Sequence, residues 1–151
     1  MTDAQVNGKD KVWYVGWSVC QKQVANLLHE LYYRPNFLHP DSTPPKKPWI
    51  FVGKVQIKLL DMINCYLCPG TPGPGAHIHI DNVDMSSWQA QISGVKTWLL
   101  RPPPECWWQC HGDMETTVYP GDIIVVNTNI WFHSTKIHGA DLSLVITNEF
   151  D

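Results

Sequence analysis

The chain has 151 residues, the length of one domain, with 44% hydrophobic residues and eight tryptophans. This composition supports a sizeable buried core and argues against disorder. The net charge of −3 provides no basic surface of the kind that binds a nucleic acid backbone. No apolar run approaches the roughly 20 residues of a membrane helix, and the amino terminus lacks an apolar signal core. We therefore expect a soluble intracellular protein, cytoplasmic or nuclear.

Five cysteines are an odd number, which argues against a disulfide-stapled secreted domain and predicts reduced thiols. Two pairs have the spacing of zinc ligands: Cys65 with Cys68, and Cys106 with Cys110 followed by His111. The two pairs are far apart in the sequence, and the first borders a proline-glycine loop. We therefore favour incidental thiols over a structural zinc site.

The first third of the chain predicts a strand, a helix and a second strand. Residues 12–17 are aromatic and β-branched, which is typical of a strand. Ser18 and Gln21 have the spacing of a capping box and predict a helix that Pro35 ends. Its apolar face would consist of Val24, Leu27, Leu28 and Leu31. After a proline-rich loop, residues 49–53 predict a buried strand.

The rest of the chain is predicted to be almost wholly β. Residues 54–68 lose an initial alternation, so we expect a peripheral insertion there, and residues 68–75 form a proline- and glycine-rich loop. Strands are then predicted near residues 87–93, 95–101, 114–119, 122–127, 130–136 and 142–149. Short strands at regular spacing are typical of a sandwich or barrel. The sequence thus predicts one mostly β domain over residues 1–151, with its core in residues 73–150.

Residues 73–81 hold three potential metal ligands at every second position, His77, His79 and Asp81. An extended backbone would turn all three side chains to one face. Two histidines and one carboxylate, with positions left open, are the ligands that hold non-haem Fe(II). A third ligand would come from a distant strand, and His133 is the candidate because it follows a Pro-Gly turn and an apolar strand.

Four motifs occur in a fixed order: His79-Ile-Asp81, the segment from Trp88 to Pro103, Pro120-Gly-Asp, and Trp131-Phe-His133. In this order the chain resembles the Jumonji C and cupin-like family of Fe(II)- and 2-oxoglutarate-dependent oxygenases. The resemblance covers residues 73–150. It implies a double-stranded β-helix, a jelly roll or cupin-like barrel, here with one helix near the amino terminus.

The resemblance also implies roles for individual residues. His79, Asp81 and His133 would be the iron ligands and the catalytic centre, and Lys96 would pair with the distal carboxylate of 2-oxoglutarate. The residues agree independently, because Lys96 interrupts an apolar strand and a lysine pointing into the core needs an anionic partner. Weaker co-substrate candidates, from neighbouring strands, are Gln89, Ser143 and Thr147.

The implied activity is hydroxylation, or demethylation by way of hydroxylation, of a substrate that is most plausibly a protein side chain. Two alternatives stay open: a cupin enzyme that uses another divalent metal without 2-oxoglutarate, and a non-catalytic cupin-like binding module. In the first, His77 with His79 and His133 would form the ligand set, whereas the family pattern makes His77 a pocket wall. The adjacent Trp107 and Trp108 would cover the pocket mouth or bind a partner.

Besides the insertion expected at residues 54–68, the sequence departs from the family pattern at two places. Ala76 replaces the hydroxyl residue that often lies three positions before the proximal histidine. The turn before His133 contains Asn127 and Asn129 in place of the usual Pro-x-Gly-Trp-Trp sequence. Both departures lie beside the expected metal site.

Overall fold

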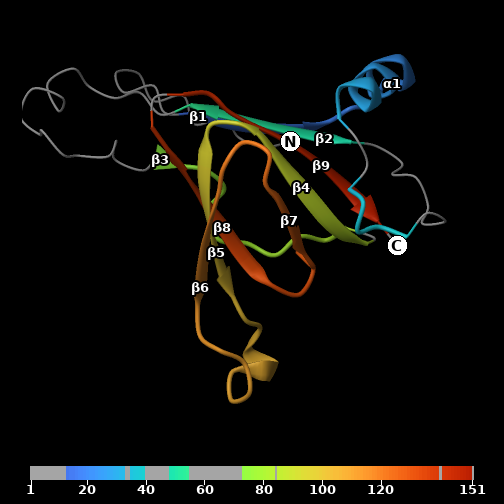
Figure 1. Cartoon of the computed structure of the whole chain (residues 1–151). Coiled ribbons are helices and arrows are strands. Elements are labelled where there is room, and N and C mark those ends of the chain that lie inside the picture. The colour runs from blue at the N-terminus through green and yellow to red at the C-terminus, as the bar shows by residue number, and fades with distance from the viewer. Residues whose placement is uncertain are drawn as a thin grey trace, which may run out of the picture.

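The computed structural model describes residues 13–32, 35–39, 48–54, 73–83, 85–139 and 141–150. Its elements are β1 Trp13–Ser18, α1 Lys22–Leu31, β2 Trp49–Lys54, β3 Gly73–Pro74, β4 Ser86–Ser93, β5 Val95–Arg101, a 3-10 helix Pro104–Cys106, β6 Met114–Val118, β7 Ile123–Val126, β8 Phe132–His138 and β9 Ser143–Phe150 (Figure 1). The strands predicted from the sequence are therefore present. No helix in this part of the chain is long and apolar enough to span a membrane.

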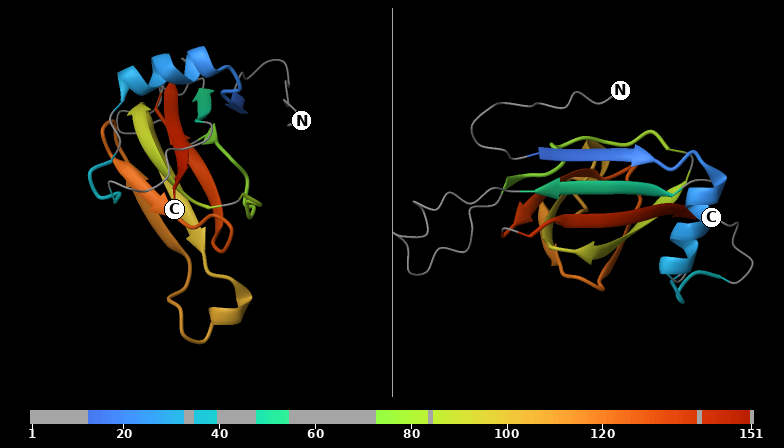
Figure 2. Two further views of the ribbon diagram at one scale, coloured as in Figure 1. Left: turned by 90° about the vertical axis from the view of Figure 1, so that its right-hand side faces the viewer. Right: turned by 90° about the horizontal axis from the view of Figure 1, so that it is seen from above.

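The strands form two antiparallel sheets, which gives a β-sandwich and confirms the mostly β class. One sheet has five strands in the order β1-β2-β9-β4-β7, and the other has four in the order β3-β8-β5-β6. Helix α1 lies at one end of the five-stranded sheet (Figures 1 and 2). Tyr32, directly after α1, receives a hydrogen bond from Asn148 of β9 and contacts Trp88 of β4 edge to face.

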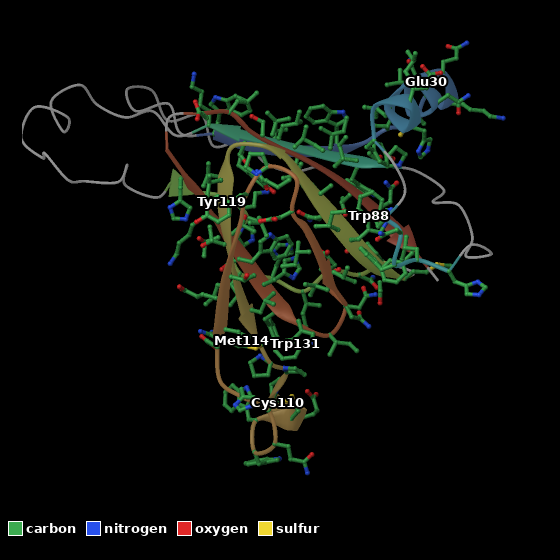
Figure 3. All side chains as sticks on the ribbon, viewed as in Figure 1. Glu30, Trp88, Cys110, Met114, Tyr119 and Trp131 are labelled. Carbon is green, nitrogen blue, oxygen red and sulfur yellow. A yellow bond between two sulfur atoms is a disulfide. The ribbon has the colours of Figure 1, made fainter. Side chains whose placement is uncertain are left out.

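The space between the sheets is filled by side chains from both of them (Figure 3). Alternating positions along the strands point inward, as the period of two requires. The buried set is unusually polar for a β core: besides Trp98, Ile137 and Val145, it includes Gln91, Lys96, His133, Thr135, Ser143 and Thr147. A core that buries so many polar groups is typical of a binding site, because each such group costs free energy unless it finds a partner.

The helix begins later than the capping-box spacing predicts. Ser18 is the last residue of β1 and pairs with Trp49, so its side chain does not reach the first turn of α1. Gln21 occupies the N-cap position without a side-chain cap. The predicted apolar face is also only partly covered, because Val24 and Leu27 are 39% and 60% exposed.

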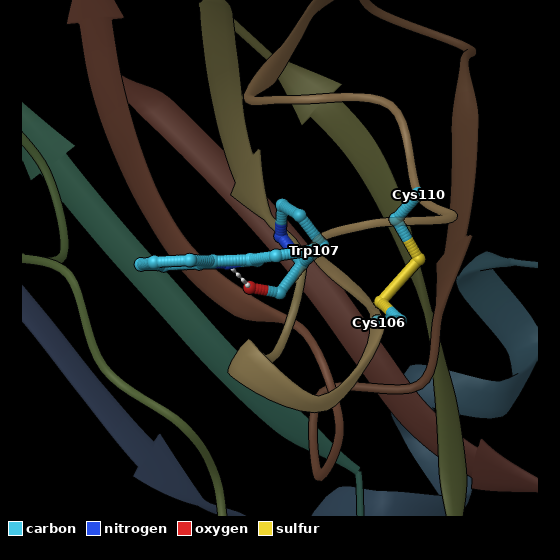
Figure 4. Close-up of a disulfide and its surroundings, with 4 residues drawn as sticks. Cys106, Trp107 and Cys110 are labelled. Carbon is cyan, nitrogen blue, oxygen red and sulfur yellow. Dashed lines mark hydrogen bonds between the residues drawn. A yellow bond between two sulfur atoms is a disulfide. The ribbon is translucent and has the colours of Figure 1, made fainter.

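Cys106 and Cys110 form a disulfide at the tip of the β5–β6 hairpin, so the prediction of reduced thiols is wrong for this pair (Figure 4). The tight turn explains it: the backbone N–H groups of Gln109 and Cys110 both donate to the Cys106 carbonyl, and the two Cα atoms lie 5.4 Å apart. Cys20 is free and exposed. The predictions for Cys65, Cys68 and residues 55–68 lie outside the described residues.

Removing this disulfide should cost little stability. A loop of five residues loses little chain entropy on closure, so we expect the double variant Cys106→Ser, Cys110→Ser to lose at most about 2 kcal/mol of unfolding free energy. Urea denaturation followed by circular dichroism would measure the loss, with Cys20→Ser as the control. A variant that fails to fold would show that the hairpin tip supports the whole sandwich.

Candidate metal centre

His79, Asp81 and His133 come together as a group that could hold a metal ion, with their ligand atoms all within 4.8 Å of one another. The backbone fixes them. His79 and His133 exchange two backbone hydrogen bonds of 3.0 and 2.9 Å, and the Asp81 amide donates to the Thr128 carbonyl. His133 is buried in β8, while His79 and Asp81 are half-buried. The group thus joins an irregular segment after β3 to the first residues of β8.

The segment that carries His79 is not one extended strand, contrary to the simplest interpretation of its alternation. Only Gly73 and Pro74 form a strand, and the chain bends before His79. His77 is exposed and does not belong to the ligand group. The alternation therefore predicts correctly that His79 and Asp81 lie together. The bend in the chain leaves His77 outside the ligand group.

Gly75 allows the segment to lie against β8. Its amide donates to the Thr135 carbonyl, and a Cβ added at Gly75 would lie only 2.9 Å from that carbonyl oxygen. The next residue, Ala76, donates from its amide to the Thr135 hydroxyl and accepts from the Thr135 amide. A side chain at position 75 would push the segment away from β8 and move His79 from the group.

Both histidines are held in the same tautomer by the backbone. The Nδ1 atom of His79 lies 2.7 Å from the His77 carbonyl, and that of His133 lies 3.1 Å from the Trp131 carbonyl. A carbonyl only accepts, so each Nδ1 carries the proton and each Nε2 presents a lone pair. A hydrogen bond from the ring nitrogen that does not bind the metal is what orients a metal-binding imidazole. The ring of Trp98 further stacks on His133, with centroids 5.6 Å apart.

The two Nε2 atoms face the two oxygens of one carboxylate. His79 Nε2 lies 3.2 Å from Asp81 Oδ1, and His133 Nε2 lies 3.8 Å from Asp81 Oδ2. Imidazole lone pairs and carboxylate oxygens are all acceptors, so their convergence requires a proton or a metal cation between them. The donor set of this structure therefore fits a divalent transition ion.

The pKa shifts follow from this convergence. The hydrogen bond with Asp81 raises the pKa of His79. Burial opposes the charge on Asp81, but its hydrogen bonds with His79 and Thr128, together with the nearby charge of His133, outweigh burial and lower the pKa of this carboxyl. Burial lowers the pKa of His133. Without a metal ion, a proton on His79 neutralises the carboxylate, and a bound metal ion would replace that proton.

The affinity of the site for a metal ion should therefore decrease as the pH is lowered. Asp81 stays ionised and His133 stays neutral near pH 7, so the proton that competes with the metal sits on His79, whose pKa lies above its usual value. Below that raised pKa we expect the affinity for Mn²⁺ to fall by about tenfold per pH unit. Titration of the protein with Mn²⁺, followed by electron paramagnetic resonance at several pH values, would measure it. A pH-independent affinity would remove His79 from the ligands.

Lys96 is fully buried between the sheets, with no carboxylate partner among the described residues. Its ammonium lies 3.5 Å from the Tyr14 hydroxyl and 5.2 Å from the centre of that ring. Burial lowers the pKa of Lys96 to about 7 and raises the pKa of Tyr14. The interior therefore contains an amine close to its pKa at neutral pH, whose protonated form an anion would stabilise, beside a phenol that remains protonated and can donate.

A pocket of about 110 Å³ opens beside Asp81, lined by Trp49, Phe51, Asp81, Val83, Ser87, Gln89, Thr147, Asn148 and Glu149. Gln89 and Thr147 are neighbours in register on β4 and β9 and both line it. The Thr147 hydroxyl donates to the Trp88 carbonyl, whereas Gln89 Oε1 has no partner among the described residues. Ser143 is buried elsewhere, 3.1 Å from Gln91 Nε2, and does not line this pocket.

The unusual turn before His133 is held by its two asparagines. The Asn127 side chain accepts from the Asn129 amide, and the Asn129 side chain accepts from the Val83 amide, two residues after Asp81. The turn therefore ties the Asp81 segment to β8 by side-chain hydrogen bonds. The two asparagines, which depart from the pattern of the family that the sequence resembles, therefore hold the turn beside the ligand group.

Sequence reasoning missed Tyr14, Trp49 and Phe51. Tyr14 alternates with Trp13 and Val15 along β1, so the period of two indicates that it points to the opposite face from them. Which sheet that face meets depends on tertiary packing. Trp49 and Phe51 stack with centroids 6.3 Å apart at the pocket wall.

The fold and site together define a β-sandwich protein with a two-histidine, one-carboxylate group that could hold a metal ion. The chain matches no known family model and no curated protein.

Proposed function

We propose that the protein is an Fe(II)- and 2-oxoglutarate-dependent oxygenase with the double-stranded β-helix arrangement of the Jumonji C and cupin-like family. One observation carries the proposal: the His79, Asp81 and His133 group shares its interior with Lys96, a buried cation without a carboxylate partner among the described residues. A metal triad alone fits many enzymes. A metal triad with a buried anion site fits a metal-binding dicarboxylate.

The ligand set supports iron. Two neutral imidazoles and one carboxylate on one side of an ion leave the remaining positions open for a co-substrate and oxygen. His77, the extra ligand of the alternative cupin set, is exposed and outside the group. The set of His79, Asp81 and His133 is therefore favoured over the three-histidine set that includes His77.

The spacing of Lys96 from the triad supports 2-oxoglutarate. On paired strands β5 and β8, Lys96 lies opposite Ile137 and Leu100 lies opposite His133. Four residues along a strand span about 13 Å between Cα atoms. The side chains of Lys96 and His133 cover part of this distance, and a five-carbon dicarboxylate would cover the rest. Lys96 thus suits the distal carboxylate and does not reach the metal.

Each residue then has a defined role. His79, Asp81 and His133 would hold the iron, while Lys96 and the Tyr14 hydroxyl would bind the distal carboxylate by charge and hydrogen bonding. Trp98 stacks on the His133 ring and would exclude water from that face of the imidazole. When bound, iron and 2-oxoglutarate supply the oxidative chemistry, in which decarboxylation to succinate is coupled to substrate hydroxylation. Gln89 and Thr147 would position the substrate or co-substrate in the adjoining pocket.

Anaerobic titration with Fe(II) and 2-oxoglutarate tests the proposal. The expected result is a weak visible charge-transfer band from the chelate, followed by succinate formation in air. Iron binding without that band would favour a cupin enzyme that uses a metal without 2-oxoglutarate. Failure to bind iron, manganese or zinc would leave only the non-catalytic binding module. The substrate, which we propose to be a protein side chain, would be sought by oxygen incorporation into candidate peptides.

A further inference from the structure

Strand β1 borders the five-stranded sheet. It pairs with β2 on one side, over all six residues from Trp13 to Ser18, and among the described residues no strand pairs with its other side. Figure 2 shows β1 at the margin of this sheet, next to β2. A strand at such a margin presents unpaired backbone donors and acceptors, which form a template for another strand.

The free edge of β1 lacks the features that usually prevent pairing with another chain. It contains neither a charged residue nor a proline. The three other described margins differ: β6 carries Glu115, which lies 3.7 Å from Lys136, while β7 has only four residues and β3 only two. Charges and short length are common protections of sheet edges. An uncharged edge of six residues is typical of a strand that pairs in the native assembly.

The outer face of β1 is also apolar and exposed. Trp13, Val15 and Trp17 alternate along the strand and point to this face, with 40%, 39% and 45% of their surfaces accessible. Exposed aromatic side chains grouped in this way mark interaction surfaces. Burial of these side chains on association would add binding free energy to that of the backbone hydrogen bonds.

The pattern of β1 is self-complementary. In an antiparallel pair formed by two copies of β1 about a two-fold axis at Val15, Trp13 of each copy would lie opposite Trp17 of the other. Val15 would face its own copy, and Tyr14 would face Gly16, the one position without a side chain. Cross-strand aromatic pairs stabilise such ladders. A closed two-fold dimer requires a patch that matches itself.

We infer that β1 is the interface of a homodimer, in which two copies pair antiparallel about Val15 and join their five-stranded sheets. The inference does not depend on the proposed catalytic function. The partner is a second copy and not an unrelated peptide, because the Trp-x-Val-x-Trp order is symmetric about its centre. An unrelated strand would not require that symmetry.

Sedimentation of the full chain over a range of micromolar concentrations tests the dimer. The expected result is a concentration-dependent dimer that Val15→Lys dissociates, because two ammonium groups would then meet at the axis. Like charges placed opposite each other should raise the dissociation constant at least about 100-fold. Val24→Lys is the matched control, since Val24 of α1 is also 39% exposed. Circular dichroism would check that both variants fold.

Cross-linking tests the register. In a background that carries Cys20→Ser, Cys65→Ser and Cys68→Ser, Val15→Cys should form covalent dimers under mild oxidation, whereas Val24→Cys should not. A chain that stays monomeric at every concentration overturns the proposal. So does a dimer that survives Val15→Lys, or one that Val24→Lys disrupts equally, because each outcome would place the contact elsewhere.

Discussion

His79→Ala should lower the affinity of the protein for Fe(II) or Mn²⁺ at least about 100-fold, whereas His77→Ala should leave it unchanged. The two histidines are two residues apart in one segment, but only His79 belongs to the ligand group. Removing its imidazole leaves one nitrogen and one carboxylate, a set that holds a divalent ion weakly. The backbone hydrogen bonds between positions 79 and 133 do not involve the side chain, so the segment should keep its path.

Isothermal titration with Mn²⁺ would measure these affinities, with thermal unfolding as the check on folding. Asp81→Asn is a second variant that keeps the size of the side chain and removes the charge, and it should behave like His79→Ala. Loss of binding in His77→Ala, with binding retained in Asp81→Asn, would instead identify the three-histidine ligand set. Equal loss in all three variants, with intact folding, would point to an ion bound elsewhere.

The local pattern of the sequence predicted the strands well, and the reason is physical. Within residues 86–150 short runs rich in apolar and β-branched residues form the strands, and glycines mark reversals at Gly94, Gly121 and Gly139, each with a positive φ. These signals depend on neighbouring residues only. The grouping of His79 with Asp81 was predictable for the same reason, because they are two positions apart.

The features that the sequence did not predict depend on packing between residues that are far apart in the chain. The contact between Tyr14 and Lys96 joins β1 to β5, which are 82 positions apart and belong to different sheets, so no local pattern indicates it. The capping box failed because pairing of Ser18 with Trp49 in β1 competes with capping. The spacing of Cys106 and Cys110 suits zinc ligands and a disulfide equally, and the turn geometry decides between them.

Two departures from the pattern of the family that the sequence resembles lie beside the ligand group. Asn127 and Asn129 stand where that pattern has a Pro-x-Gly-Trp-Trp turn. Their side-chain oxygens accept hydrogen bonds that link Val83 to the turn before His133. Ala76 gives up a hydroxyl, while Tyr14 offers one beside Lys96. In the anion site that we propose at Lys96, the Tyr14 hydroxyl would be an additional donor.

Lys96→Met should abolish 2-oxoglutarate binding, spare metal binding and stabilise the fold. Methionine fills a similar volume without a charge, so the core stays packed while the anion loses its cation, and we expect at least about a 100-fold loss of affinity. Burial lowers the pKa of Lys96 to about 7. Because each pKa unit corresponds to about 1.4 kcal/mol, the buried ammonium costs the wild-type fold several kcal/mol at neutral pH.

The pH dependence separates this effect from simple repacking. The unfolded chain binds the Lys96 proton more tightly than the folded chain. The unfolding free energy of the wild type should therefore rise between about pH 7 and pH 10. Over the same range the difference in unfolding free energy between Lys96→Met and the wild type should shrink. Wild-type affinity for 2-oxoglutarate should fall above about pH 7 as the free lysine loses its proton.

Lys136→Met, which removes an exposed lysine of β8, is the control for both measurements. Denaturation curves and anaerobic titrations at several pH values would test the two trends together. Retained 2-oxoglutarate affinity in Lys96→Met would remove Lys96 from the site, and unchanged stability would mean that an anion outside the described residues already neutralises it.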